Sequence, residues 1–250
     1  EMQRSLVGSE MCIRDSTDKE HYDDVIGFSN PEESKHDWFN MGHTSTSISL
    51  ACGFAKARDL IGGSENVIAV IGDGSLGGGQ AFEGLNYAAE QNSGLIIIVN
   101  DNDMSIAENH GGIYKNLKLL RETNGQAECN LFCAMGLDYI YVDHGNDVAE
   151  LIQAFESVKD SKKAVVVHIN TLKGKGYAPA EQHKEAWHYC SPFDPAAVLE
   201  ELAKEESGVP QVIPTDVPEE YADLTAEYLL CKMKEDSRVV GITSGTPTVM

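Results

Sequence analysis

An acid and an amide follow two successive predicted strands, and together they have the chemistry to bind a divalent cation. Asp73 comes directly after the apolar run at 67–71 and its closing glycine, and Asn102 follows the apolar run at 95–99. The carboxyl ends of neighbouring parallel strands meet at one edge of a sheet, so we expect the two side chains to lie close together. Mg²⁺ binds through one or two protein oxygens together with substrate phosphates. The pair therefore predicts a metal site that holds a diphosphate.

The glycine-rich turn around Asp73 also fits other functions. Residues 72–77 match the pattern G-x-G-x-x-G, which is typical of dinucleotide binding between a strand and a helix. A carboxylate at Asp73 would repel the pyrophosphate at the helix N-terminus, so a cation is needed between the two anions. Gly72 and Gly74 would let the backbone approach a diphosphate closely. A nicotinamide dinucleotide site stays open, and so does a plain turn in which Asp73 only caps the helix.

A parallel α/β sheet is the architecture that would position these residues. Four short apolar runs, at 67–71, 95–99, 139–142 and 165–169, predict buried strands. Three other segments, one before the first run and two between runs, carry apolar residues at helical spacing: Ile48, Ala51 and Ala55; Phe82, Leu85 and Ala89; and Val148, Ile152 and Phe155. This alternation predicts a doubly wound parallel sheet with flanking helices and with ligands at the carboxyl ends of its strands.

The chain divides into four predicted segments. Residues 1–16 show no sustained period and read as a leader foreign to the fold, and residues 17–203 form the metal- and diphosphate-binding domain. Residues 204–220 are acidic, contain three prolines and read as a linker. Residues 221–250 combine an amphipathic helix, which includes Tyr228 and Cys231, with a strand-like run. We expect them to be the truncated start of a second α/β domain.

Composition and charge exclude some classes of partner. The 250 residues contain 19 Lys and Arg against 40 Asp and Glu, a formal net charge of −21, which argues against binding nucleic acid or an anionic membrane. The apolar runs are far shorter than a membrane span requires. Six scattered cysteines indicate a reducing cytoplasm. Cys129 and Cys133 lie four residues apart, but without further ligands nearby we expect buried apolar side chains rather than a zinc site.

Two histidines and a basic loop are further candidates for chemistry. His43 precedes a run of N-cap residues, so we expect its ring at a helix entrance, where it could transfer protons or simply be exposed. His188 lies between two aromatic residues, eleven positions after Tyr177, in a segment that could form a lid. Lys173 and Lys175 could meet a substrate phosphate, although a solvated basic turn explains them nearly as well.

Five separated blocks resemble the 1-deoxy-D-xylulose-5-phosphate synthase family of the transketolase-like superfamily. They are GHTSTSISLACGFAKA, GDGSLGGGQAFEGLN, NDNDMSIAEN, KGKGYAPAE and WHYCSPFDP, and the resemblance covers most of residues 17–195. It implies the thiamine diphosphate-binding fold, with thiamine diphosphate and Mg²⁺ as cofactors. The second domain of this family binds the pyrimidine of the cofactor, which gives the expected role of residues 221–250.

The resemblance also implies roles for individual residues. Asp73, Asn102 and the backbone carbonyl of Met104 would bind Mg²⁺, and Gly74, Ser75 and Asn102 would hold the diphosphate. Near the cofactor, it implies contacts from Gly42, His43, Thr44 and Tyr177, and catalytic roles for His43 and His188. The family's further N-terminal histidine segment and the glutamate that bonds the aminopyrimidine have no counterpart in this sequence, so we expect little or no turnover from these 250 residues alone.

For the parent protein, the resemblance implies condensation of pyruvate with glyceraldehyde 3-phosphate to 1-deoxy-D-xylulose 5-phosphate and CO₂. It further implies a cytoplasmic homodimer that serves isoprene and thiamine biosynthesis. Two other functions stay open beside the dinucleotide site. One is a transketolase-like enzyme that uses a ketose donor, and the other is a non-catalytic fragment that binds only a ligand or a partner chain.

Overall fold

The computed structural model describes residues 29–32, 37–188, 228 and 231–235. The chain divides into two compact units, Glu1–Trp187 and His188–Met250. The predicted leader at 1–16 and the predicted linker at 204–220 lie outside the described residues, as does most of the segment at 221–250. In the second unit, Tyr228 and residues 231–235 are helical, in agreement with the helix predicted there.

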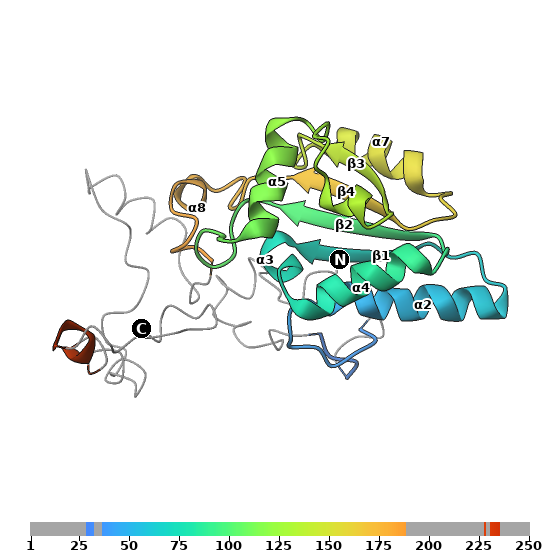
Figure 1. Cartoon of the computed structure of the whole chain (residues 1–250), viewed down its shortest axis with the longest axis horizontal. Helices are drawn as coiled ribbons and strands as arrows, with labels where there is room; N and C mark the ends of the chain where they lie inside the picture. The colour runs from blue at the N-terminus through green and yellow to red at the C-terminus, as the bar shows by residue number, and fades with distance from the viewer. Residues whose placement is uncertain (1–28, 33–36, 189–227, 229–230, 236–250) are drawn as a thin grey trace, which may run out of the picture. The chain divides into compact units, whose positions relative to one another are not determined.

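The first unit contains a parallel four-stranded sheet (Figure 1). Its strands are β1 (Val67–Gly72), β2 (Leu95–Asp101), β3 (Asp138–Val142) and β4 (Val165–Asn170), in the order β1-β2-β4-β3. Every pairing in this sheet is parallel. Since β1 and β2 are neighbours and Gly72 pairs with Asn100, the residues that follow the two strands emerge at the same edge, as the sequence predicts.

Helices precede, separate and follow the strands in sequence, and they cover both faces of the sheet (Figure 1). They are α2 (Ser47–Ile61), α3 (Asp73–Leu76), α4 (Gly79–Glu90), α5 (Gly112–Glu122), α6 (Leu131–Ala134), α7 (Val148–Val158) and α8 (Ala178–Gln182). The predicted α/β architecture, a parallel sheet with flanking helices, is therefore confirmed. Among the described residues, no helix has the length and apolar character to cross a membrane.

Two apolar cores lie on the two faces of the sheet. Side chains alternate along β2, so Ile97 and Val99 belong to the core formed with α2, α4, α5 and α6. Ile96 and Ile98 belong to the smaller core formed with α7. This alternation places helices on both sides of one buried strand, which is what a doubly wound sheet requires.

The predicted apolar face of α2 is confirmed, whereas that of α7 is wrong. Val148 and Ile152 are 68% and 57% exposed. The helix instead turns Leu151, Phe155 and Val158 toward the sheet, together with Ala154. These four positions follow the spacing i, i+3, i+4, i+7 that makes a continuous stripe, and only Phe155 of the predicted triplet lies on it.

Three further predictions of burial are wrong. Ile68 and Val70 are 53% and 37% exposed, because α7 packs on β2, β3 and β4 rather than on β1. Phe82 of α4 is 37% exposed, although Leu85 on the same helix is buried.

The two neighbouring cysteines also differ from the prediction. Cys129 and Cys133 are exposed. The Asn130 side chain caps α6 by accepting hydrogen bonds from the backbone N–H groups of Phe132 and Cys133. Phe132 is the residue of this short helix that is fully buried.

Candidate functional site

The turn after β1 buries a carboxylate. Asp73 is the first residue of α3 and only 2% exposed. One carboxylate oxygen accepts a hydrogen bond from the backbone N–H of Gly74 at 2.9 Å, and the other accepts one from Nδ2 of Asn109 at 2.8 Å. A Cβ at Gly74 would lie 2.2 Å from Oγ of Ser105, so a glycine is needed for this close approach to the segment after β2.

Asp73 carries its negative charge in a buried position without an ion pair among the described residues. Burial, followed by the negative charge of Asp101, raises its pKa to about 7. Among the described residues, no Lys, Arg or His forms an ion pair with Asp73, although its charge acts on the Lys173 ammonium. A bound cation would stabilise the ionised carboxylate, so the residue fits a metal ligand.

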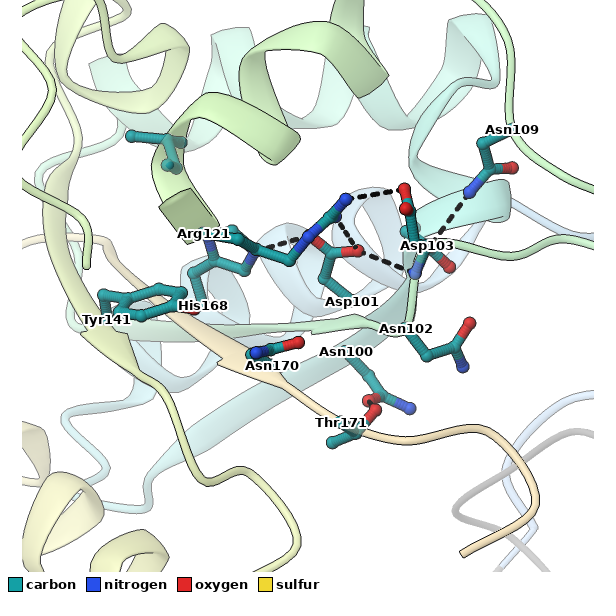
Figure 2. A network of polar contacts seen from close by, with 12 residues as sticks. Asn100, Asp101, Asn102, Asp103, Asn109, Arg121, Tyr141, His168, Asn170 and Thr171 are labelled. Carbon is teal, nitrogen blue, oxygen red and sulfur yellow. Dashed lines mark hydrogen bonds and ion pairs between the residues drawn. The ribbon is translucent and has the colours of Figure 1, made fainter. Parts of the chain in front are cut away.

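The end of β2 sends consecutive side chains to opposite sides (Figure 2). Asp101 points toward Arg121 and His168, whereas Asn102 points to the other side, together with Asn100. Oδ1 of Asn102 accepts a hydrogen bond from the backbone N–H of Met104 at 3.1 Å. The backbone N–H of Met104 also lowers the pKa of Asp73, so this N–H group lies near both the carboxylate and the amide oxygen.

The segment before α2 packs against the glycine-rich turn. Oγ of Ser45 donates a hydrogen bond to the backbone carbonyl of Ser75 at 2.7 Å, and a Cβ at Gly78 would lie 2.1 Å from that Oγ. Ser45 has a φ of 71°. The predicted residues Gly42, His43 and Thr44 are exposed and directly precede Ser45 in the chain.

His43 contacts its own neighbour in the chain. Its Nδ1 lies 2.7 Å from the backbone carbonyl of Thr44, and the ring precedes α2 at the helix entrance, as predicted. Its catalytic role stays a prediction.

The basic loop after β4 reaches the same region through Lys173. Nζ of Lys173 donates a hydrogen bond to the backbone carbonyl of Ser105 at 2.5 Å. Burial lowers the pKa of Lys173, while the Asp73 carboxylate acts in the opposite direction. Lys173 is therefore close enough to Asp73 for their charges to interact, which supports its candidacy as a residue of this site.

The aromatic residue of the loop has a local partner. Tyr177 is the N-cap residue of α8, and its ring meets Trp187 edge to face at 5.1 Å between centroids. His188 is exposed and begins the second unit. The predicted cofactor contact of Tyr177 and the predicted catalytic role of His188 both stay predictions.

Five polar residues form a connected network beside the site, which we call the Asp101 network: Asp101, Asp103, Arg121, Tyr139 and His168. Nη1 of Arg121 contacts both carboxylate oxygens of Asp101, at 2.6 and 2.5 Å (Figure 2). Nε2 of His168 lies 2.9 Å from Oδ2 of Asp101, and its Nδ1 lies 2.8 Å from the Tyr139 hydroxyl. Nη2 of Arg121 also contacts Oδ1 of Asp103 at 2.6 Å.

Asn109, Ser105 and the Asp101 network were not predicted from the sequence. One signal was present, because His168 interrupts the apolar run at 165–169. A polar residue in a buried strand needs a hydrogen-bond partner, which Asp101 and Tyr139 provide. Asn109 and Ser105 lie in a loop whose path is set by tertiary contacts, and the sequence carried no comparable signal for them.

The donor set suits some metals better than others. Among the described residues, no group of three or more His, Cys, Asp and Glu could hold a metal ion. One carboxylate, one amide oxygen and a backbone carbonyl match the oxygen ligands that Mg²⁺ takes when phosphates complete its coordination. A pocket of about 590 Å³ beside α5 and α6 contains none of the predicted site residues.

Comparisons with known proteins agree with the sequence resemblance. Residues 14–130 match a family described as 1-deoxy-D-xylulose-5-phosphate synthase. The chain is 38% identical to 1-deoxy-D-xylulose-5-phosphate synthase 2 of Geobacter sulfurreducens, over 89% of this chain and 40% of that protein. It is 35% identical to the enzyme of that name from Porphyromonas gingivalis, over 90% of this chain and 40% of that protein. The chain therefore spans about 40% of the length of the curated relatives it matches.

A solved structure supports the fold. The transketolase of Campylobacter jejuni superimposes with a TM-score of 0.50 and 22% sequence identity, over 66% of this chain and 26% of that chain. This similarity indicates a shared α/β architecture.

Proposed function

We propose that this chain, a relative of the 1-deoxy-D-xylulose-5-phosphate synthases, binds thiamine diphosphate together with Mg²⁺ at the carboxyl ends of β1 and β2. The observation that carries the proposal is the buried Asp73 carboxylate, whose pKa is raised to about 7 and which lies with the Asn102 amide oxygen around the Met104 N–H. A divalent cation between the two side-chain oxygens would remove the unfavourable charge and attract a diphosphate.

Each residue of the site has a distinct role in the proposal. Asp73 and Asn102 bind Mg²⁺ through their side chains, and Met104 does so through its backbone carbonyl. The diphosphate is held by Gly74 and Ser75, where the backbone comes close without a Cβ at residue 74. Binding requires the Asn102 amide oxygen to exchange its hydrogen bond from Met104 for the ion.

Residues outside the metal site would orient the rest of the cofactor. Gly42, His43 and Thr44 lie just before Ser45, which is bonded to the glycine-rich turn. Tyr177 would supply an aromatic contact, and His43 and His188 would move protons. When bound, thiamine diphosphate supplies the nucleophilic carbon that decarboxylates a keto acid and carries its two-carbon unit.

The proposed activity of the whole protein follows from its relatives. The names of these relatives and the transketolase-like fold support condensation of pyruvate with glyceraldehyde 3-phosphate, which gives 1-deoxy-D-xylulose 5-phosphate and CO₂. The product would feed isoprenoid and thiamine biosynthesis. We further propose that the whole protein is a cytoplasmic homodimer.

Isothermal titration calorimetry tests the cofactor assignment. We expect thiamine diphosphate to bind in the presence of Mg²⁺ and not in the presence of EDTA. Asn102→Ala should weaken binding by at least about tenfold, because it removes a metal ligand. Asn86→Ala is the matched control, because Asn86 is an exposed asparagine within α4. Binding of NAD without Mg²⁺, unaffected by Asn102→Ala, would instead support a dinucleotide site.

A further inference from the structure

The Asp101 network lies directly beside the proposed metal ligands but has no part in the cofactor contacts described above. Asp101 and Asp103 flank Asn102 in the sequence, and both carboxylates contact the same guanidinium, that of Arg121. One cation from α5 therefore holds the two neighbours of Asn102 from one side of the β2 end, while Asn102 points to the other side (Figure 2). A planar guanidinium with several donors in a fixed arrangement is suited to bridge two carboxylates.

The network also fixes the backbone of the turn after β2. The backbone N–H of Asp103 donates to Oδ1 of Asp101 at 3.1 Å, and Asp103 has a φ of 64°. A non-glycine residue rarely adopts this left-handed conformation unless its surroundings impose it. The bonds to Asp101 and Arg121 supply that constraint, and the next residue in the chain is Met104.

The network is buried at its centre and satisfied in its hydrogen bonds. The side chains of Asp101 and His168 are both 0% exposed. Burial alone would raise the pKa of Asp101, but the hydrogen bonds from His168 and Arg121 outweigh it and lower the pKa. Since the Asp101 carboxylate only accepts, Nε2 of His168 must carry a proton. The hydroxyl of Tyr139 can then donate to Nδ1, which locks the orientation of the ring.

These bonds distinguish two acids that lie next to each other. Asp101 receives its compensating charge from Arg121 within the protein, whereas Asp73 has no ion pair among the described residues. The network thus leaves Asp73 as the acid that a bound cation would compensate.

We propose that Arg121, Asp101 and Asp103, supported by His168 and Tyr139, are positioning residues that hold the Asn102–Met104 turn in the geometry needed to bind Mg²⁺ and diphosphate. This inference rests on the proposed cofactor, and it assigns the network no contact with the ligand. Residues that orient metal ligands from behind commonly change metal affinity by about 10- to 100-fold when they are removed.

Three variants of the 250-residue chain test this inference. Asp103→Ala removes the exposed carboxylate that pairs with Arg121 and leaves Arg121 paired with Asp101, so we expect this variant to fold. Arg121→Met removes the guanidinium and therefore both ion pairs, with Asp101 and with Asp103. Arg58→Met is the matched control, because Arg58 has the same 13% side-chain exposure as Arg121 and likewise pairs with an aspartate. Arg58 bonds the carbonyl of Gly94, at the opposite end of β2 from Asn102.

The first measurement needs no ligand. Hydrogen exchange of the peptide covering residues 101–105 should become faster in Asp103→Ala and Arg121→Met than in the parent chain. In Arg58→Met it should stay unchanged, even where that variant loses as much thermal stability. Unchanged exchange at 101–105 in Asp103→Ala would overturn the inference.

The second measurement is the Mg²⁺ concentration for half-saturation at a fixed concentration of thiamine diphosphate, followed by calorimetry. We expect it to rise about tenfold or more in Arg121→Met, about threefold or more in Asp103→Ala, and not in Arg58→Met. If Arg121→Met does not fold, Asp103→Ala decides. Parent-like Mg²⁺ affinity in Asp103→Ala would overturn the role in metal binding. If exchange at 101–105 is faster in these variants but the parent chain binds no thiamine diphosphate, the proposed function is overturned. The positioning of the turn then stays supported.

Discussion

At the scale of single residues, the site depends on how the fold treats two neighbouring acids. Asp101 is compensated by Arg121 and hydrogen-bonded by His168, whereas Asp73 is buried with hydrogen bonds from Gly74 and Asn109 but no ion pair among the described residues. A buried carboxylate without a counter-charge lowers the stability of the ligand-free protein. Such a cost at a strand end is typical of a position kept for binding.

The first prediction concerns the charge of Asp73. Its pKa of about 7 in the folded chain exceeds the value of about 4 in the unfolded chain, so between these pH values the folded state holds an extra proton. Raising the pH through this window therefore destabilises the ligand-free fold, and the full penalty is present above pH 7. Asp73→Asn should remove this penalty, on the order of 1–3 kcal/mol at pH 8, and the gain should shrink toward pH 4.

Calorimetric melting of the ligand-free protein at pH 5 and pH 8 checks this prediction. For a domain of this size, the expected gain at pH 8 corresponds to about 2–4 °C per kcal/mol. Asp160→Asn, at an exposed position after α7, serves as the control for removal of one negative charge. A melting temperature of Asp73→Asn below that of the parent chain at pH 8 would contradict the assignment.

The second prediction concerns the contact between the two turns. Gly74→Ala should destabilise the protein by about 1–3 kcal/mol, because the new Cβ would lie 2.2 Å from Oγ and 3.0 Å from Cβ of Ser105. Ser105→Ala removes the hydroxyl, so the double variant should recover part of the loss. Urea unfolding of the four proteins gives the coupling energy. Additive effects of the two substitutions would show that the turns do not touch.

At the scale of elements, the sequence predicted the strands and the shared edge of the sheet at which the segments after β1 and β2 begin. The apolar runs at 67–71 and 95–99 are long, rich in Ile and Val, and end at Gly or Asn, so they identified β1 and β2 and the edge at which both strands end. The prediction that Asp73 lies at the tip of its strand needed only this periodicity and the parallel topology, whereas its burial was not predicted.

The errors at this scale have a common physical cause. The face that α7 buries is selected by its packing on β2, β3 and β4, a tertiary outcome that the triplet of apolar residues did not reveal. The exposure of Ile68 on β1 depends on which strands α7 covers. The Asp101 network joins residues from four elements, and no local pattern indicates such a meeting.

The third prediction tests the face of α7. Leu151→Ala should destabilise the protein by about 1–3 kcal/mol, because Leu151 packs on the sheet. Ile152→Ala, one position later and 57% exposed, should change stability by less than about 0.5 kcal/mol. The free energy of unfolding in urea measures both. A larger loss of stability in Ile152→Ala than in Leu151→Ala would instead support the buried face that the sequence predicted.

At the scale of the whole molecule, the net charge of −21 opposes the approach of an anionic ligand. The local features that counter this charge are the nearby Lys173 ammonium and, in the proposal, the metal ion. The architecture supplies a single edge of the sheet where the glycine-rich turn, the segment before α2 and the loop after β4 converge.

The fourth prediction follows from this charge. Because salt screens the repulsion between the protein and a diphosphate, the association rate of thiamine diphosphate at constant Mg²⁺ should rise as KCl increases from about 20 to about 200 mM. Stopped-flow fluorescence measures this rate, and choline chloride in place of KCl controls for specific ion effects. A steep fall in rate with added salt would indicate a basic binding surface instead.

The central claim is that Asp73 and Asn102 share one divalent ion. Crystals of the chain grown with thiamine diphosphate and Mn²⁺ in place of Mg²⁺ would locate this ion by its anomalous scattering. The account predicts an anomalous peak about 2.1 Å from a carboxylate oxygen of Asp73 and from Oδ1 of Asn102, with the diphosphate on its far side. A bound diphosphate with no peak between these two side chains, or a peak that contacts neither of them, would contradict it.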